Sequence, residues 1–151
     1  MGNELRLVCF ELQHQQFAFP IDSVRETLSM QPITRVFLTP PCVAGVFSLR
    51  GEIVPALDLG PLLAISRRQI GDDSKIVVLK NALGTVGVIV DRLLDQQRVE
   101  DIQPPPPSLA PEVAMLLKGV ATVETGLLRI LDASAILDVE ALRALRKEAA
   151  G

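Results

Sequence analysis

Aromatic side chains are scarce in this sequence. The 151 residues include neither tryptophan nor tyrosine, so phenylalanine alone supplies the aromatic fraction of 3%. The core must therefore be built from valine, leucine and isoleucine, in a chain that is 48% hydrophobic. These residues favour pleated strands wherever they alternate with polar ones. The composition predicts a folded, mainly β protein that is long enough to bury most of its apolar surface.

The residue types that catalysis and metal binding require are also few. His14, the only histidine, lies among glutamines in an expected turn, where an exposed polar residue is the ordinary interpretation. Cys9 and Cys42 lack metal-ligand spacing, so we expect two buried, reduced thiols. Gly84 and Gly87 lack the lysine and the strand-to-helix context of a phosphate-binding loop. The sequence predicts no catalytic residues, no metal site and no cofactor.

Long apolar runs and an excess of positive charge are missing as well. The longest runs, such as Ile76–Leu79 and Val86–Val90, are far shorter than the ~18 apolar residues of a membrane span. The formal net charge is −3, which provides no attraction for nucleic-acid phosphates or anionic lipid. No export signal opens the chain. We therefore expect a cytoplasmic protein that neither enters the membrane nor binds nucleic acid.

The chain resembles itself in two registers. In one, the stretch 43–63 falls on 117–137, and in the other, 17–26 falls on 86–95. The matched pairs are Gly45 with Gly119, Val46 with Val120, Leu57 with Leu131, Asp58 with Asp132, and Glu26 with Asp95. Because the two halves run in the same order, we interpret the chain as two similar small barrels. Generic patterning of valine-rich hairpins is the alternative interpretation.

Alternation with a period of two predicts about ten short strands. Turn residues punctuate them at Gln13–Gln16, Arg50-Gly51, Asn81–Gly84 and Thr125-Gly126. We predict one domain over residues 1–151, with a first subdomain at about 5–63, a polar connector at 64–74 and a second subdomain at about 75–137. The pattern of residues 138–149 predicts an amphipathic terminal helix. The four prolines Pro104–Pro107 predict a stiff connector at the surface.

One turn residue stands out as a candidate for binding. Arg50 occupies a hairpin turn whose counterpart in the second half holds Glu124, so the hairpin itself does not require an arginine. A guanidinium at a turn can reach carboxylates in a fork geometry. Glu26 is ambiguous, because it is either a solvated strand residue or a partner for a cation such as Arg50.

At these residues the sequence resembles the CheW family of chemotaxis coupling proteins. The resemblance is carried by SVRE around Val24 and Glu26, GVFSLRGEIVPALDL from Gly45, GVIVDRL from Gly87, and the closing LLKGVATVETGLLRILD. Together these blocks span nearly the whole chain. Ser48 departs from the asparagine that usually precedes LRG in this family. The resemblance implies two packed, five-stranded, SH3-like barrels without catalysis.

The resemblance also implies partners and contact residues. Family members bridge the cytoplasmic tip of a chemoreceptor and the regulatory domain of a CheA-type histidine kinase, in arrays at the inner face of the cell membrane. The positions that match coupling residues are Val24, Glu26, Arg50 and Gly51, with Val88 and Ile89 near the receptor groove. The same adaptor can serve a type IV pilus, twitching or phototaxis pathway instead of swimming.

Two hypotheses of other classes remain. The first is a small enzyme or ligand-binding barrel whose polar groups are Asp22, Asp58, Asp91 and Asp132. The paired positions of these residues in the two halves favour a role in turns instead. The second is a structural protein that assembles with itself through exposed strand edges.

Overall fold

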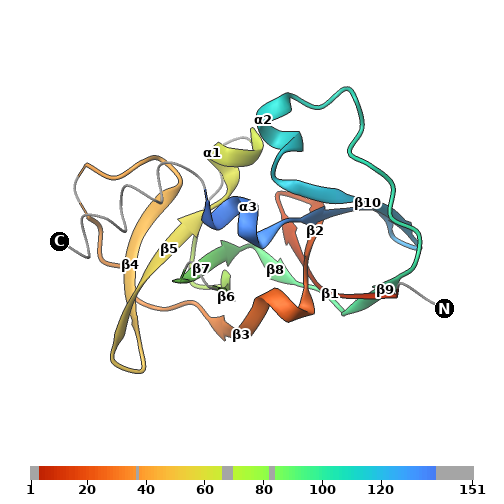
Figure 1. Ribbon diagram of the computed structural model, residues 1–151. Helices are drawn as coiled ribbons and strands as arrows, with labels where there is room; N and C mark the ends of the chain where they lie inside the picture. The colour runs from red at the N-terminus through yellow and green to blue at the C-terminus, as the bar shows by residue number, and fades with distance from the viewer. Residues whose placement is uncertain (1–3, 37, 66–69, 82–83, 139–151) are drawn as a thin grey trace.

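The computed structural model describes residues 4–36, 38–65, 70–81 and 84–138. They form eleven strands in two mixed sheets, joined by four short helical segments (Figure 1). The mainly β fold class is confirmed, whereas the predicted terminal helix lies outside the described residues beyond Asp138. The elements are β1 (Leu5–Leu12), β2 (Gln15–Pro20), the 3-10 helix η1 (Ile21–Ser23), β3 (Val24–Ser29), β4 (Val43–Leu49), β5 (Glu52–Asp58), α1 (Gly60–Leu63), β6 (Lys75–Asn81), β7 (Gly84–Val90), β8 (Arg92–Leu93), β9 (Gln97–Val99), α2 (Pro111–Ala114), β10 (Leu117–Val123), β11 (Gly126–Leu131) and α3 (Ala133–Leu137).

The strands divide into a six-stranded sheet A and a five-stranded sheet B. Sheet A has the order β10-β11-β2-β1-β8, with β9 also paired to β1, and sheet B has the order β3-β6-β7-β5-β4. Most neighbouring strands are antiparallel, but β11 pairs with β2 and β5 pairs with β7 in parallel. No described helix has the length and apolar character that a membrane crossing requires.

The two halves of the sequence exchange their first hairpins. The hairpin β1–β2 lies in sheet A with the later strands β8–β11, and the hairpin β6–β7 lies in sheet B with β3–β5. The contiguous subdomain limits predicted at 5–63 and 75–137 are therefore wrong as limits of the sheets. A sequence repeat shows which segments have similar local structure. It does not show whether the first hairpin of each half pairs with strands of its own half or of the other half.

The predicted repeat register is confirmed by the strand pairing. In β4 and β5, Gly45 faces Ala56 after a bulge, and in β10 and β11, Gly119 faces Ile130 after a bulge at the same place. A crossing segment then pairs with each hairpin, at Thr34 in the first half and at Gln103 in the second. The two halves thus have equivalent local structure.

The matched glycines are explained by these crossing segments. A Cβ on Gly45 would lie 2.3 Å from the carbonyl oxygen of Thr34, and a Cβ on Gly119 would lie 2.4 Å from that of Gln103. Gly45 also has φ of +153°, which other residues rarely adopt. Each crossing segment exchanges two backbone hydrogen bonds of 2.8–2.9 Å with β4 or β10. Glycine is required because the two backbones approach too closely for a side chain.

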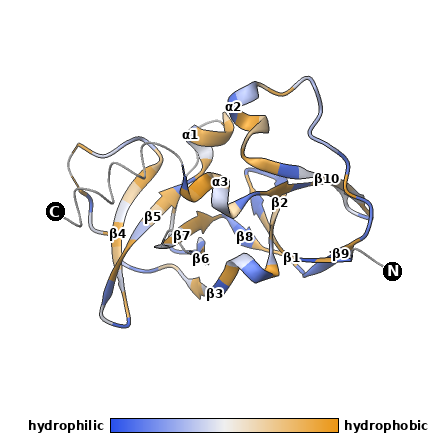
Figure 2. Ribbon diagram, viewed as in Figure 1, coloured by the Kyte–Doolittle hydropathy of each residue, from blue (hydrophilic) through white to orange (hydrophobic). Residues whose placement is uncertain are grey.

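A shared core joins the two sheets. It takes residues from both, including Phe10 and Phe17 of sheet A and Val88 of sheet B. Leu57 and Leu131, which the repeat matches, are both fully buried in it. Figure 2 shows hydrophobic residues concentrated on α1, α3 and the strands beneath them. Two smaller hydrophobic clusters pack against the other faces of sheets A and B, one for each sheet. Because the shared core contains residues of both sheets, we expect the two sheets to unfold together.

Candidate partner-binding site

The tip of the β4–β5 hairpin is joined to β3 by an ion pair. Arg50 and Gly51 form the two-residue turn with φ of 49° and 86°, the left-handed conformation typical of tight hairpins. The turn projects the Arg50 guanidinium toward Glu26 on β3. Nη1 donates to Glu26 Oε2, and Nη2 donates to Glu26 Oε1 at 2.7 Å. The structure therefore resolves the ambiguity at Glu26, which is the partner of Arg50.

The ion pair keeps both groups charged. The hydrogen bond from Arg50 has the largest effect and lowers the pKa of Glu26. Burial opposes it, and the charges of Arg50 and Arg25 lower the pKa further. The same hydrogen bond raises the pKa of Arg50. The Arg50 side chain is still 61% exposed, whereas that of Glu26 is 19% exposed. A guanidinium has five N–H donors, so Arg50 can bind a second acceptor while it remains paired.

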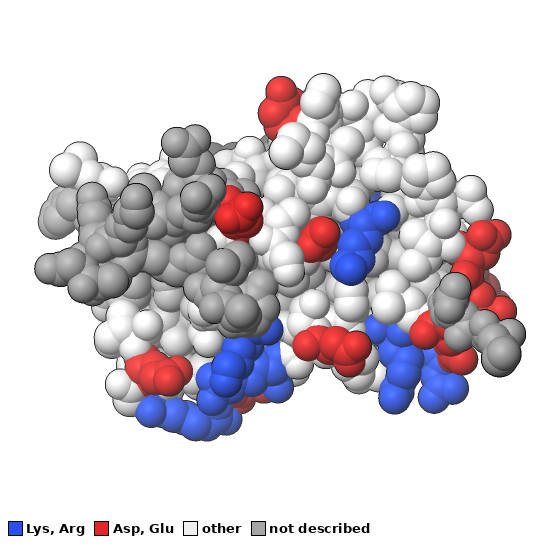
Figure 3. Space-filling model, in the orientation of Figure 1, with Lys and Arg blue, Asp and Glu red and all other residues white. Residues whose placement is uncertain are grey.

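Other side chains complete the surface at this end of the molecule. Arg25 lies 3.7 Å from Glu26 and 3.8 Å from Glu52, so two arginines and two glutamates form one neutral cluster. Acidic and basic side chains gather together at this lower end in Figure 3. Gly51 is exposed and has open space around its Cα. We call Arg25, Glu26, Arg50, Gly51, Glu52 and Ile53 the hairpin-tip surface.

Ile53 was missed by the sequence reasoning. Its side chain is 70% exposed on β5, because Val54 takes the inward position beside it. It faces Ser48 across the hairpin, on the outer side. The alternation of inward and outward residues along 52–58 is the signal that could have identified it. An exposed isoleucine beside a charged cluster is a combination common in binding surfaces.

The remaining predicted contact residues occupy different environments. Val24 begins β3 and is half-buried against the shared core, so part of it faces the solvent near Glu26. Val88 and Ile89 are fully buried in β7, which lies between β5 and β6. Neither side chain reaches the surface of the free chain, and their assignment near the receptor groove stays a prediction. In a strand covered on both faces, an apolar run reflects burial and not a binding surface.

Three of the four aspartates in the ligand-binding hypothesis accept structural hydrogen bonds. Asp58 accepts from the backbone N–H of Gly60 at 2.9 Å, and Asp132 caps α3 by accepting from Ala135 at 3.1 Å. Asp91 accepts from the N–H of Gln13 at 2.6 Å. These contacts fix turns and helix starts, as the paired positions in the repeat predict. They account for Asp58, Asp91 and Asp132 without a ligand.

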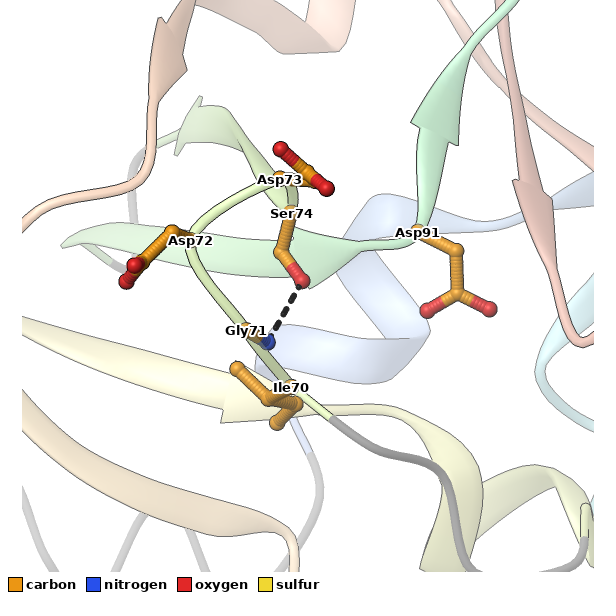
Figure 4. A pocket seen from close by; sticks show the side chains of 6 residues that line it. All are labelled: Ile70, Gly71, Asp72, Asp73, Ser74 and Asp91. Carbon is orange, nitrogen blue, oxygen red and sulfur yellow. Dashed lines mark hydrogen bonds between the residues drawn. The ribbon is translucent and has the colours of Figure 1, made fainter.

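The hollow shown in Figure 4 does not have the geometry of a metal site. It measures about 420 Å³ and is lined by Ile70, Gly71, Asp72, Asp73, Ser74 and Asp91. The carboxylates of Asp72 and Asp91 point away from each other, and the Ser74 hydroxyl accepts from the N–H of Gly71 at 3.2 Å. Within the described ranges, no three His, Cys, Asp or Glu residues are close enough to hold a metal ion.

Comparisons with known proteins identify the family and the fold. The profile of the CheW-like domain matches residues 6–141. The chain is 28% identical over 137 residues to the chemotaxis protein CheW of Bacillus subtilis. This alignment covers 89% of this chain and 88% of the Bacillus protein. The chain is 32% identical over 105 residues to protein FrzA of Myxococcus xanthus, covering 68% and 66%. The crystal structure of the scaffolding protein TtCheW from Thermoanaerobacter tengcongensis superposes with a TM-score of 0.80 and 26% identity, covering 93% of this chain and 91% of that one.

Proposed function

The chain belongs to the CheW-like domain family, and on this premise we propose that it couples a CheA-type histidine kinase to chemoreceptors through the hairpin-tip surface. The family consists of non-catalytic scaffolds, and this member is a scaffold of chemotaxis signalling. The proposed partners are the regulatory domain of the kinase and the cytoplasmic tip of a receptor. The proposed location is the cytoplasm, next to receptor arrays on the inner face of the membrane.

The observation that supports this proposal is the geometry of Arg50. Its guanidinium is held in a fixed orientation by Glu26 and yet is mostly exposed. A preorganised arginine loses little conformational entropy when it binds, and its fork geometry suits carboxylates and carbonyl oxygens. The neighbouring Ile53 adds exposed apolar area that a partner can bury. Gly51 leaves the backbone of the turn open to close approach. Val24 and Glu26 border the same surface, whereas Val88 and Ile89 pair with Leu57 and Asp58 at the opposite end of β5.

The proposal is tested by binding measurements on the purified chain. A CheA-type regulatory domain and a receptor cytoplasmic fragment are titrated separately with the wild type and with Arg50→Glu. We expect the wild type to bind both and Arg50→Glu to bind at least one of them about tenfold more weakly. Binding of neither by the wild type would contradict the proposal.

A matched charge reversal separates a local effect from a general one. Arg92 in sheet A is 69% exposed and lies 3.9 Å from Glu11, so Arg92→Glu alters net charge by the same amount at a similarly exposed site. We expect Arg92→Glu to bind both partners like the wild type. The double variant Glu26→Arg with Arg50→Glu restores the ion pair but reverses its direction, and we expect it to fold normally while partner binding stays weak. Recovery of binding in the double variant would show that Arg50 supports the surface only through the ion pair.

A further inference from the structure

Two ion pairs span the gap between β3 and the β4–β5 hairpin. The strands β3 and β4 are the two edges of sheet B, so the strand order does not pair β3 with the hairpin. Arg50 of the turn and Glu26 of β3 make the first connection. Arg25 of β3 and Glu52 of β5 make the second, with 3.8 Å between Arg25 Nη1 and Glu52 Oε2. Each side of the gap thus contributes one cation and one anion, and side chains hold the hairpin tip at two points.

A bulge in β3 explains how Arg25 reaches the hairpin. Between Val24 and Glu26, β3 advances by two residues while its partner β6 advances by one, so Arg25 is the extra residue. Consecutive side chains of a regular strand point to opposite faces, whereas a bulge changes the direction of a side chain. Arg25 therefore lies on the same side as its neighbour, with 3.7 Å between its Nε and Oε2 of Glu26.

Arg25 and Arg50 approach the same carboxylate oxygen but differ in their surroundings. Arg50 Nη1 donates to Oε2 of Glu26, and Arg25 Nε faces that same atom. The Arg25 side chain is 34% exposed against 61% for Arg50, so Arg25 is the more enclosed of the two. Its two contacts also use two different nitrogens, because Nη1 is the atom that faces Glu52. Arg25 thus holds two carboxylates, whereas Arg50 presents its remaining donors to the solvent.

The second half of the repeat lacks this arrangement. The four equivalent positions there hold two acidic residues and no basic one, namely Leu94, Asp95, Glu124 and Gly126. The hairpin of β10 and β11 still forms, with a complete ladder from Gly119 to Val123. The four charges are therefore a property of the hairpin-tip surface and not a requirement of the fold.

We propose that Arg25 is a positioning residue, which fixes the direction of the Arg50 guanidinium by holding Glu26 and, through Glu52, the hairpin itself. The inference rests on the proposed function and deepens it, because it separates the arginine that meets the partner from the arginine that orients it. Arg50 donates to the partner, whereas Arg25 stays with its two carboxylates and does not touch the partner. Without Arg25, the Arg50 side chain samples more directions and loses more conformational entropy when it binds.

The first measurement needs no partner. NMR relaxation of the Arg50 Nε–Hε group is compared in the full-length wild type, Arg25→Gln and Glu52→Gln. We expect its order parameter to fall by about 0.2 in both variants, because each removes one end of the second ion pair. Arg25→Lys keeps the charge on a single nitrogen, so the fall should be smaller. The matched control Arg98→Gln removes an arginine that lies 3.5 Å from Glu4 in sheet A, and it should leave Arg50 unchanged.

The second measurement is a double-mutant cycle in the binding assay, with the probe whose affinity Arg50→Glu lowers. We expect Arg25→Gln alone to bind about threefold to fivefold more weakly, with an unchanged melting temperature. When Arg25→Gln is added to Arg50→Gln, binding should weaken by no more than about 1.5-fold. A positioning residue has no further effect once the group that it positions is gone.

The outcomes separate this inference from the proposed function. An order parameter of Arg50 that is the same in Arg25→Gln and in the wild type would overturn the proposal. A full loss of affinity from Arg25→Gln in the Arg50→Gln background would overturn it too, because Arg25 would then contact the partner itself. If the wild type binds neither probe, the proposed function fails, whereas the relaxation measurement still decides whether Arg25 orients Arg50.

Discussion

Truncation of Leu131 tests whether the two sheets depend on one core. Leu131 ends β11, is fully buried and packs in the cluster shared by both sheets. Leu131→Ala removes apolar contacts and leaves a cavity that well-packed neighbours can fill only in part. Truncation of a buried leucine to alanine costs roughly 2–5 kcal/mol, so we expect a loss of about 3 kcal/mol in the free energy of unfolding. For a chain of this length that loss lowers the melting temperature by roughly 6–12 °C.

The assay is urea and thermal unfolding followed by circular dichroism, with Leu127→Ala as the matched control. Leu127 is the same residue type on the same strand, but it is 41% exposed. Its truncation should change stability by no more than about 0.5 kcal/mol. Each variant should unfold in one transition. A loss below about 1 kcal/mol for Leu131→Ala, or equal losses for the two variants, would refute the placement of β11 against the shared core. Two separate transitions would show that the sheets are independent.

Three further predictions concern backbone packing, the ion pair and thiol burial. Gly119→Ala places a Cβ 2.4 Å from a backbone carbonyl oxygen, so it should lower the free energy of unfolding by about 1–3 kcal/mol in a thermal unfolding experiment. Gly71→Ala meets open space and should have little effect. Equal melting temperatures of the two variants would contradict the close approach at Gly119. In an NMR titration, the pKa of Glu26 should lie below the usual glutamate range and should return to that range in Arg50→Gln. A lowered pKa in the folded state stabilises the fold at pH values above the unfolded pKa. This stabilisation is lost as the pH falls through the folded pKa. Burial raises the pKa of Cys9 to about 11, so this thiol should react with an aromatic disulfide reagent only after denaturation, and rapid reaction of the native protein at pH 8 would contradict its burial.

Local pattern predicted the strands and the equivalence of the halves well. The alternation along 43–49 becomes a strand with alternating burial, and the match of Gly45 with Gly119 becomes two equivalent close approaches. Leu57 and Leu131 are buried as expected. These features depend on residues near one another in the sequence, or on copies of the same local pattern, so the sequence contains the information directly.

The site was predicted only in part. Arg50 and Glu26 were recognised as candidates, but their pairing depends on how β3 and the β4–β5 hairpin are placed, 24 residues apart along the chain. The burial of Val88 and Ile89 could not be predicted, because an apolar run does not reveal whether one face of a strand or both are covered. Arg25 drew no attention in the sequence, because the bulge that turns it toward Glu52 is a feature of the strand pairing.

The sequence by itself determined that this chain is a β-rich, internally repeated scaffold of the CheW-like family, with aliphatic cores and few residues suited to catalysis. Only the tertiary structure decided that the halves exchange their first hairpins, that Arg50 pairs with Glu26, and that Arg25 lies close to Glu52. The physical reason is the range of the interactions. Side-chain periodicity and turn chemistry act over a few residues. Strand exchange and surface charge pairs depend on contacts between segments that are distant in sequence, so no local pattern predicts them.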